Sequence, residues 1–531
     1  NTSGFEGSGI YLRDNSNLLV TNSVLWGNGN DQVYFRDSGD DVSLNISYSL
    51  VEDGQSGIDV NNNGSLDWGI GMLQSNPYFC NGEGGIFSLR ENSPCITAGD
   101  DGEFIGCYSV GCGPINTGPV WYVGELGNDS SDGSLDTPFL TIQRAVDACT
   151  DGDTVRINPG SYIESVDFNS KDIVLESRAY ELVDAALIMQ TVITSGALGG
   201  SCIELIGQDA ANLEIKGITF SGGQSQIGGG IYVENSSPKL TGIIVENNTA
   251  EVGGGVYLNQ SDVELDGVII RNNGANFGGG LYATGSSISL VSVSIDSNIA
   301  YWGAGLYSEN SSSNIENTNI SFNHAFIEGG AIYQNGNNLT ISETAITSNT
   351  GLDFGGALVC YMGIMDLDRC TVAGNIANYG SAFNLREAVV TVSNSIIWEN
   401  GENTVYSSSG SQASMFNLGY TNFYGGENYL SNSPSIILDW GDGNLNTDPL
   451  FCNPAENDFA LQEGSVCLSA SDTFGTIGAF TGNCGQQLSV DQIALPTGFH
   501  LHQNYPNPFN PVTTIKYNVI EPGVVTISVF S

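Results

Sequence analysis

The chain has 531 residues, of which 70 are glycine and only 13% are charged. Its 58 acidic and 13 basic residues give a formal net charge of -45. Nucleic acids are bound through Lys and Arg, so this balance excludes nucleic acid as a partner. No run of about 18 apolar residues exists, and we therefore expect no membrane span.

The N-terminal segment is repeated near the end of the chain. Asn22-Ser-Val-Leu-Trp26 matches Asn394-Ser-Ile-Ile-Trp398, and Asn76-Pro-Tyr-Phe-Cys80 matches Asp448-Pro-Leu-Phe-Cys452. Both matches have an offset of 372 residues. We expect residues 1–113 to be the last coil and C-terminal cap of one repeat module. Residues 114–120 would be a linker, and 121–485 a complete second module with its cap at 402–485.

Cysteines recur in the two matching segments. The chain has 11 Cys in all, so at least one is unpaired. The recurrence favours disulfides, and hence an oxidising compartment, over buried free thiols. Which two of each three cysteines pair is left open. The six candidates are Cys80, Cys95, Cys112, Cys452, Cys467 and Cys484.

One acidic loop in the first segment has the beginning of a calcium-binding pattern. Asp59, Asn61, Asn63 and Asp67 supply oxygen atoms at positions 1, 3, 5 and 9, with a Gly at position 6. Position 12 is Ile70, where such loops have an acid. Calcium is therefore the one cofactor the sequence leaves open.

A helix is predicted over 137–149, at the start of the second module. Thr137 is the expected N-cap and Pro138 the first helical residue. Leu140, Ala145 and Val146 form an apolar stripe at helical spacing. We expect this helix to cover the N-terminal end of the module.

The central region, 228–401, repeats every 25 or 26 residues. Each repeat opens with a Gly-rich tetrad or pentad such as Gly-Gly-Gly-Ile-Tyr, and short β-branched runs follow between turn residues. Units this short bury an apolar side only when they stack, each strand pairing in parallel with its equivalent in the next unit. The tetrads and pentads begin at Gly228, Gly253, Gly278, Gly303, Gly329, Gly355 and Gly380.

An asparagine marks the same turn of every repeat. Stacked at that turn, each side-chain amide could satisfy its neighbour. The sequence thus predicts a parallel β-helix with an internal asparagine ladder. The ladder residues are Asn248, Asn273, Asn298, Asn323, Asn349, Asn375 and Asn400.

These repeats resemble those of the chlamydial polymorphic outer-membrane proteins, and the segment from Thr137 resembles the opening of pectin-lyase-like domains. The resemblance implies an all-β, right-handed parallel β-helix solenoid in two tandem modules, on a bacterial surface. It also raises adhesion as a function.

Tyrosines share one register and should form an aromatic ladder. If the preceding aliphatic residue points inward, the tyrosine row points outward and could stack on sugar rings. A ladder that only stabilises the solenoid is the alternative. Its members are Tyr232, Tyr257, Tyr282, Tyr307 and Tyr333.

Basic residues are rare in the coils. Stacking by the repeat spacing puts Arg271 between Glu246 and Asp296. An exposed ion pair is the simpler interpretation. An acid–base–acid site is the alternative.

The tail, 496–531, departs from the repeat after a linker at 486–495. It is similar to the first half of the C-terminal sorting domain of type IX secretion substrates. The resemblance implies an Ig-like β-sandwich and the type IX machinery as a partner. It also implies export through the periplasm to the cell surface or the medium. The motif residues are Asn504, Tyr505, Pro506, Asn507, Pro508, Phe509, Asn510 and Pro511.

We therefore expect a non-catalytic secreted or cell-surface protein for adhesion or for binding polysaccharide or host glycans. A polysaccharide lyase or glycosidase is one alternative, and a purely architectural role is another.

Overall fold

The computed structural model describes residues 9–480, apart from short gaps, and a few positions beyond. The gaps are 30, 37–40, 61–63, 83–85, 113–115, 165, 197–198, 208–212, 402, 408–411 and 431–434; the later described positions are 482, 484, 500–501 and 517–518. The chain forms two compact units, Asn1–Thr117 and Gly118–Ser531. The division falls inside the predicted linker.

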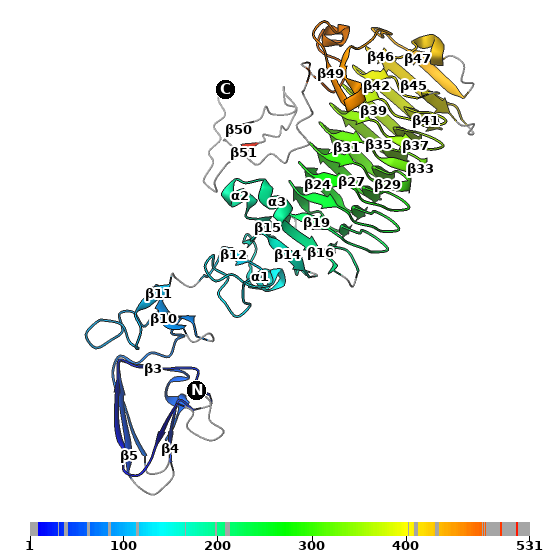
Figure 1. Ribbon diagram of the computed structural model, residues 1–531. Coiled ribbons are helices and arrows are strands. Elements are labelled where there is room, and N and C mark those ends of the chain that lie inside the picture. Colours follow the sequence, from blue (N-terminus) through cyan, green and yellow to red (C-terminus); the bar gives the residue numbers. More distant parts are fainter. Residues whose placement is uncertain are drawn as a thin grey trace, which may run out of the picture. The chain divides into compact units, whose positions relative to one another are not determined.

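The second unit is a three-sided parallel solenoid whose strands stack coil upon coil (Figure 1). Short β-branched runs form the sides, and Gly and Asn turns join them because these residues tolerate a positive φ. The three sides are three long sheets of 13, 11 and 9 strands. All three are parallel throughout, as stacked repeats require.

The first sheet contains β12 (Val120–Val123), β13 (Thr154–Ile157), β15 (Val174–Ser177), β18 (Glu214–Lys216), β21 (Lys239–Thr241), β24 (Asp262–Asp266), β27 (Ser287–Val291), β31 (Ser312–Glu316), β35 (Asn338–Ser342), β39 (Ile364–Asp368), β42 (Val389–Ser393), β45 (Ser414–Gly419) and β47 (Ile436–Trp440). The second contains β14 (Gly160–Ile163), β16 (Thr191–Thr194), β19 (Thr219–Ser221), β22 (Ile244–Glu246), β25 (Ile269–Arg271), β28 (Ser294–Asp296), β32 (Asn319–Ser321), β36 (Ala345–Thr347), β40 (Thr371–Ala373), β43 (Ile396–Trp398) and β46 (Asn422–Phe423).

The third sheet contains β17 (Ile203–Ile206), β20 (Ile231–Glu234), β23 (Val256–Asn259), β26 (Leu281–Thr284), β30 (Leu306–Glu309), β34 (Ile332–Asn335), β38 (Leu358–Tyr361), β41 (Phe383–Arg386) and β44 (Val405–Ser407). A shorter sheet of β29 (Ile299–Trp302), β33 (His324–Glu328) and β37 (Thr350–Gly351) precedes the third side in three coils.

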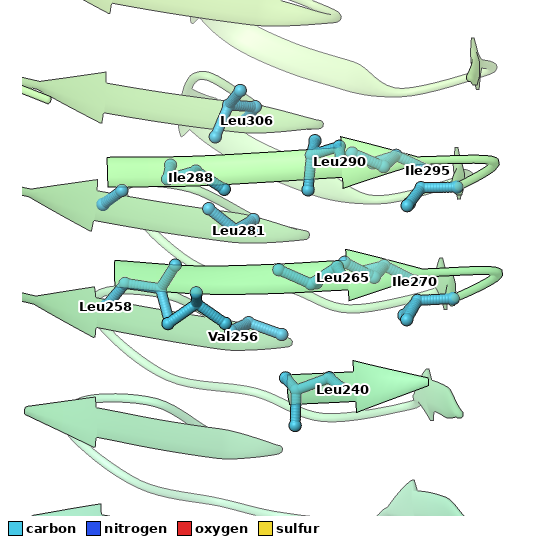
Figure 2. Packing of buried hydrophobic residues seen from close by; sticks show 14 of the residues in the cluster. Leu240, Val256, Leu258, Leu265, Ile270, Leu281, Ile288, Leu290, Ile295 and Leu306 are labelled. Atoms are coloured by element: carbon cyan, nitrogen blue, oxygen red, sulfur yellow. The ribbon is translucent and has the colours of Figure 1, made fainter. Parts of the chain in front are cut away.

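The core runs along the inside of the solenoid. Leu240, Leu265 and Leu290 are register partners on successive coils and lie one above another (Figure 2). All three are fully buried. The repeat stabilises the fold because stacking buries such a column of apolar side chains in every coil.

The asparagine ladder lies inside one corner of the solenoid. Asn298 is fully buried, and its Nδ2 donates to the carbonyl oxygen of Ile270 and to Oδ1 of Asn323, both at 3.0 Å. Its Oδ1 accepts from the backbone N–H of Asn273 at 3.0 Å. Each amide therefore satisfies a turn as well as its neighbour. The same pattern links Asn248, Asn273, Asn298, Asn323, Asn349, Asn375 and Asn400.

The predicted N-terminal helix is shorter than expected. It runs over α1 (Ile142–Ala148), and its N-cap is Thr141, not Thr137. Asp129 Oδ1 accepts hydrogen bonds from the backbone N–H groups of Leu140 and Thr141, both at 2.9 Å, so the chain stays extended there. Leu140 is accordingly 44% exposed and not part of the apolar stripe. Packing of α1 on β12 and β13 covers this end of the sheet.

Other helical turns in the second unit are α2 (Ala179–Leu182), α3 (Ala186–Gln190), α4 (Glu427–Leu430), η3 (Pro454–Glu456) and η4 (Val466–Ser469). The pairs β48 (Phe451–Asn453) with β49 (Asp458–Leu461), and β50 (His500–Leu501) with β51 (Tyr517–Asn518), are antiparallel.

The first unit holds parts of three coils rather than one. β1 (Ile10–Leu12), β4 (Val33–Phe35) and β7 (Ile58–Asp59) form one side, and β2 (Asn17–Thr21), β5 (Val42–Ser47) and β8 (Gly64–Trp68) another. β3 (Val24–Leu25) pairs with β6 (Leu50–Val51), and η1 is Gly54–Gly57. The cap is a mixed sheet of β9 (Phe79–Asn81), β10 (Ile86–Arg90) and β11 (Val110–Cys112).

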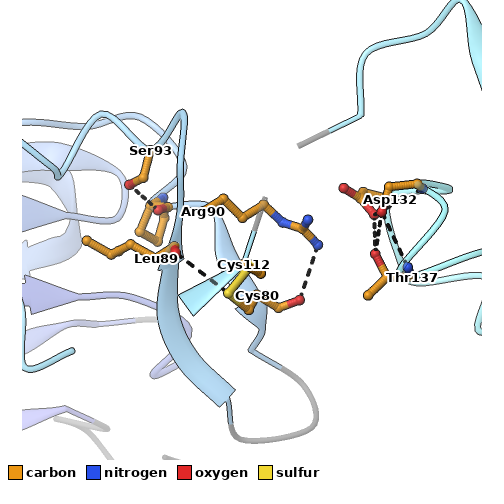
Figure 3. Close-up of a disulfide and its surroundings, with 9 residues drawn as sticks. Cys80, Leu89, Arg90, Ser93, Cys112, Asp132 and Thr137 are labelled. Atoms are coloured by element: carbon orange, nitrogen blue, oxygen red, sulfur yellow. Dashed lines mark hydrogen bonds between the residues drawn. A yellow bond between two sulfur atoms is a disulfide. The ribbon is translucent and has the colours of Figure 1, made fainter. Parts of the chain in front are cut away.

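Both caps are closed by a disulfide. Cys80 bonds Cys112 (Figure 3), and Cys452 bonds Cys484, each across 32 positions. The third cysteine of each set, Cys95 or Cys467, is a buried free thiol. Two disulfides at equivalent places are consistent with an extracellular protein.

The two caps repeat their hydrogen bonds as well as their sequence. Ser93 Oγ donates to the carbonyl oxygen of Pro77, and Ser465 Oγ to that of Pro449, both at 2.6 Å. The side-chain oxygen of Asn394 accepts the N–H of Asp472, as that of Asn22 accepts Asp100, both at 3.0 Å.

Candidate functional site

The predicted tyrosine ladder lies along the outer face of the third sheet. The rings belong to β20, β23, β26, β30 and β34, whose flanking aliphatic residues point into the core. Neighbouring centroids are 4.6 to 5.4 Å apart. The row comprises Tyr232, Tyr257, Tyr282, Tyr307 and Tyr333.

The tyrosine ladder is accessible at one end only. Tyr307 and Tyr333 are each 9% exposed. Phe277 lies edge-on to Tyr307 at 5.7 Å, and Tyr361 lies edge-on to Tyr333 at 5.4 Å. Phe277 and Tyr361 thus cover the end of the ladder at Tyr307 and Tyr333, while its beginning, from Tyr232 to Tyr282, is only half-buried.

Carboxylates accept hydrogen bonds from the tyrosine hydroxyls. Tyr282 donates to Glu309 at 2.9 Å, and Tyr232 donates to Glu234. Burial, with Glu309 nearby, raises the pKa of Tyr307 to about 12. The tyrosines therefore stay protonated at neutral pH, and the face combines aromatic rings with acidic hydrogen-bond acceptors.

Glu328 is a feature that the sequence analysis missed. The column beside the ladder is aromatic at Phe277, Trp302, Phe354 and Tyr379, and Glu328 takes the place in the middle. Its carboxylate accepts a 2.8 Å hydrogen bond from Tyr361. The break in an otherwise aromatic column was the signal available in the sequence.

Burial raises the pKa of Glu328 above its ordinary value of 4.5, and the negative charge of Asp353 raises it further. The hydrogen bond from Tyr361 and the positive charge of Arg386 act in the opposite direction but do not cancel the effect of burial. A carboxyl group with a raised pKa beside a second acid is a chemically competent acid–base group.

The weak catalytic candidates form an ion pair. Glu246, Arg271 and Asp296 occupy the same register position on β22, β25 and β28. Arg271 Nη2 lies 2.7 Å from Glu246 Oε2, and both side chains are partly exposed. Arg271 is therefore engaged with an acid and is not poised as a base.

Two of the proposed calcium-loop residues, Asp59 and Asp67, lie in different strands. Asp59 ends β7, whereas Asp67 lies in β8 of another sheet and accepts a 2.9 Å hydrogen bond from Asn45. Asn61 and Asn63 lie outside the described residues. Within the described residues, no group of three or more His, Cys, Asp or Glu side chains could hold a metal ion.

The sorting-motif residues, 504–511, also lie outside the described part of the chain. Among the described helices, none is both long and apolar enough to cross a membrane.

A hollow of about 1150 Å³ in the first unit is a second candidate for ligand binding. Phe87 and Cys107 are among its lining residues. In the second unit the equivalent Phe459 and Ala479 pack on the preceding coil, where Ala479 N–H donates to Thr371 Oγ1 at 3.0 Å. We therefore interpret the hollow as a surface on which a coil packs and not as a ligand-binding site.

A family match supports the fold of the second unit. A family described as "Right handed beta helix region" matches residues 254–418. The structure of pectate lyase Pel9A is similar with a TM-score of 0.44 and 15% identity, covering 70% of this chain and 98% of that one. The complex of XylC with xylose has a TM-score of 0.32 and 10% identity, covering 63% and 87%. No curated protein matches. The parallel solenoid and the family match together show that the chain folds as a right-handed parallel β-helix.

Proposed function

We propose that the chain is a non-catalytic secreted or cell-surface protein that binds glycan through the outer face of its third sheet. One observation carries this proposal: stacked tyrosines, half-buried from Tyr232 to Tyr282, lie beside carboxylates that accept hydrogen bonds. Sugar rings stack their C–H faces on aromatic rings while their hydroxyl groups donate to such acceptors. Export by the type IX machinery is part of the proposal and is supported by the tail motif.

The test uses the intact chain on immobilised neutral and acidic polysaccharides, with and without Ca²⁺. Retention on the polysaccharide and new chain ends are scored in the same samples. We expect retention without new ends. A chain that is neither retained nor active on any polysaccharide contradicts the proposal and leaves an architectural role.

Variants separate the ladder from the rest of the surface. Tyr257→Ala removes a ring from the open end and should weaken retention at least fivefold, whereas Tyr257→Phe keeps the ring and should retain most of the binding. Tyr429→Ala is the matched control, because Tyr429 is 44% exposed but lies in α4. Equal retention by Tyr257→Ala and the wild type would count against the ladder.

A polysaccharide lyase or glycosidase is the second candidate, favoured by the raised pKa of Glu328 beside Asp353. New chain ends that disappear in Glu328→Gln would support this candidate and displace the first.

A further inference from the structure

A second aromatic cluster lies at the edge of the same sheet, beyond the buried part of the ladder. Tyr379 lies 5.4 Å from Phe354 and 5.0 Å from Tyr406, and Phe354 lies 5.8 Å from Tyr406, measured between ring centroids. Tyr379 is 46% exposed, in contrast to the covered Tyr307 and Tyr333. The three rings therefore form a platform that is open to solvent.

An amide occupies the ladder position next to this platform. Asn384 stands in the tyrosine column, in register with Val359 on one side and Tyr406 on the other. Its side chain is 1% exposed, and its Oδ1 has no hydrogen-bond partner. The column, which is aromatic up to Tyr333, continues with Val359 and then this buried amide, in the coils where the rings of the platform lie.

The polar groups linked to Asn384 by hydrogen bonds do not supply the missing donor. Asn384 Nδ2 donates to the Tyr361 hydroxyl at 3.3 Å, and that hydroxyl donates its only hydrogen to Glu328 at 2.8 Å. Glu328 is an acceptor when ionised. A chain of three polar groups thus ends in an unpaired buried carbonyl oxygen, which is unfavourable until an outside donor reaches it.

The charges around the cluster select against acidic ligands. Asp353 and Glu328 are close enough for their charges to interact, and Arg386 is the cation that acts on Glu328. The chain as a whole carries a net charge of -45. A glycan with carboxylates would meet repulsion here, whereas neutral sugars bring only hydroxyl donors and C–H faces.

We propose that Phe354, Tyr379, Tyr406 and Asn384 form a discrete subsite for one pyranose ring of a neutral glycan. The ring stacks on the exposed face of Tyr379, and one of its hydroxyl groups donates to Asn384 Oδ1 after the side chains that cover this oxygen move aside. This subsite rests on the proposed glycan-binding function and adds to it a place and a preference for uncharged sugars.

The experiment is affinity electrophoresis of the intact chain in gels that contain mixed-linkage β-glucan, galactomannan or polygalacturonate. Tyr379→Ala removes the exposed ring. Asn384→Val removes the amide and introduces the residue that the chain already has one coil earlier, at Val359. Tyr301→Ala is the matched control, because Tyr301 is also 46% exposed but lies outside the cluster.

We expect Tyr379→Ala and Asn384→Val each to weaken retardation by a neutral polysaccharide at least fivefold, with Tyr301→Ala unchanged. Thermal unfolding of each variant verifies that it is folded. If Tyr379→Ala and Asn384→Val are retarded as strongly as the wild type but Tyr257→Ala is not, the subsite is overturned and the ladder is left as the binding surface. Stronger retardation by polygalacturonate overturns the neutral preference. Wild-type protein unaffected by every polysaccharide overturns the subsite together with the glycan-binding function.

Discussion

Asn298 illustrates what single residues do in this fold. Replacing it by alanine removes the acceptor of the buried Asn273 N–H and one donor to the carbonyl oxygen of Ile270. An unpaired buried donor costs about 1–3 kcal/mol and each other hydrogen bond lost about 0.5–1.5 kcal/mol, so Asn298→Ala should lower the free energy of unfolding by about 2–5 kcal/mol. Urea denaturation measures the loss. Asn314→Ala, on the exposed face of β31, should change stability by less than about 0.5 kcal/mol. Equal effects of the two would contradict the ladder.

Glu328 should make stability depend on pH. Its pKa is raised in the folded state, so the folded state holds the proton more tightly than the unfolded state does. The resulting stabilisation is complete below the unfolded pKa and is lost as pH rises through the folded pKa. Glu328→Gln imitates the protonated side chain and should raise the melting temperature relative to wild type at pH 7 but not at pH 4. A difference of the same size at both pH values would contradict the assignment.

Among the elements, the C-terminal cap tests the role of the disulfides. The Cys452–Cys484 bond closes a loop of 32 positions, for which chain entropy gives a stabilisation of about 3–4 kcal/mol. The double variant Cys452→Ser/Cys484→Ser should therefore unfold at lower denaturant concentration and be cut earlier in the cap during limited proteolysis. Cys107→Ser, at an exposed free thiol, is the control. A cap that resists proteolysis equally without the bond would show that its apolar cluster suffices.

Elements also show where prediction from sequence succeeds and fails. The Gly and Asn periods predicted parallel stacking, and the sheets confirm it, because register in a solenoid follows directly from repeat length. The predicted start of α1 was wrong by four residues, because Asp129, outside the helix, accepts hydrogen bonds from the preceding backbone. The cover over Tyr307 was also missed: it comes from Phe277, which lies in the turn that precedes the strand of the previous coil. Local patterns do not contain such contacts.

At the scale of the whole molecule, the net charge of -45 should oppose folding by self-repulsion. Raising NaCl from about 10 mM to 300 mM shortens the screening length from about 30 Å to less than 10 Å and should raise the melting temperature. KCl at the same ionic strength should act equally. A higher melting temperature in CaCl₂ than in NaCl at matched ionic strength would reveal bound calcium. A fall in melting temperature with added salt would contradict the electrostatic account.

Glycan binding by the aromatic face of the third sheet is the central claim, and affinity electrophoresis of wild type beside Tyr257→Ala/Tyr379→Ala tests it most directly. The double variant removes one ring from each open part of that face. We predict that a neutral polysaccharide retards the wild type and that the double variant migrates as it does in a plain gel. Equal retardation of the two proteins, or no retardation of the wild type, would contradict the account.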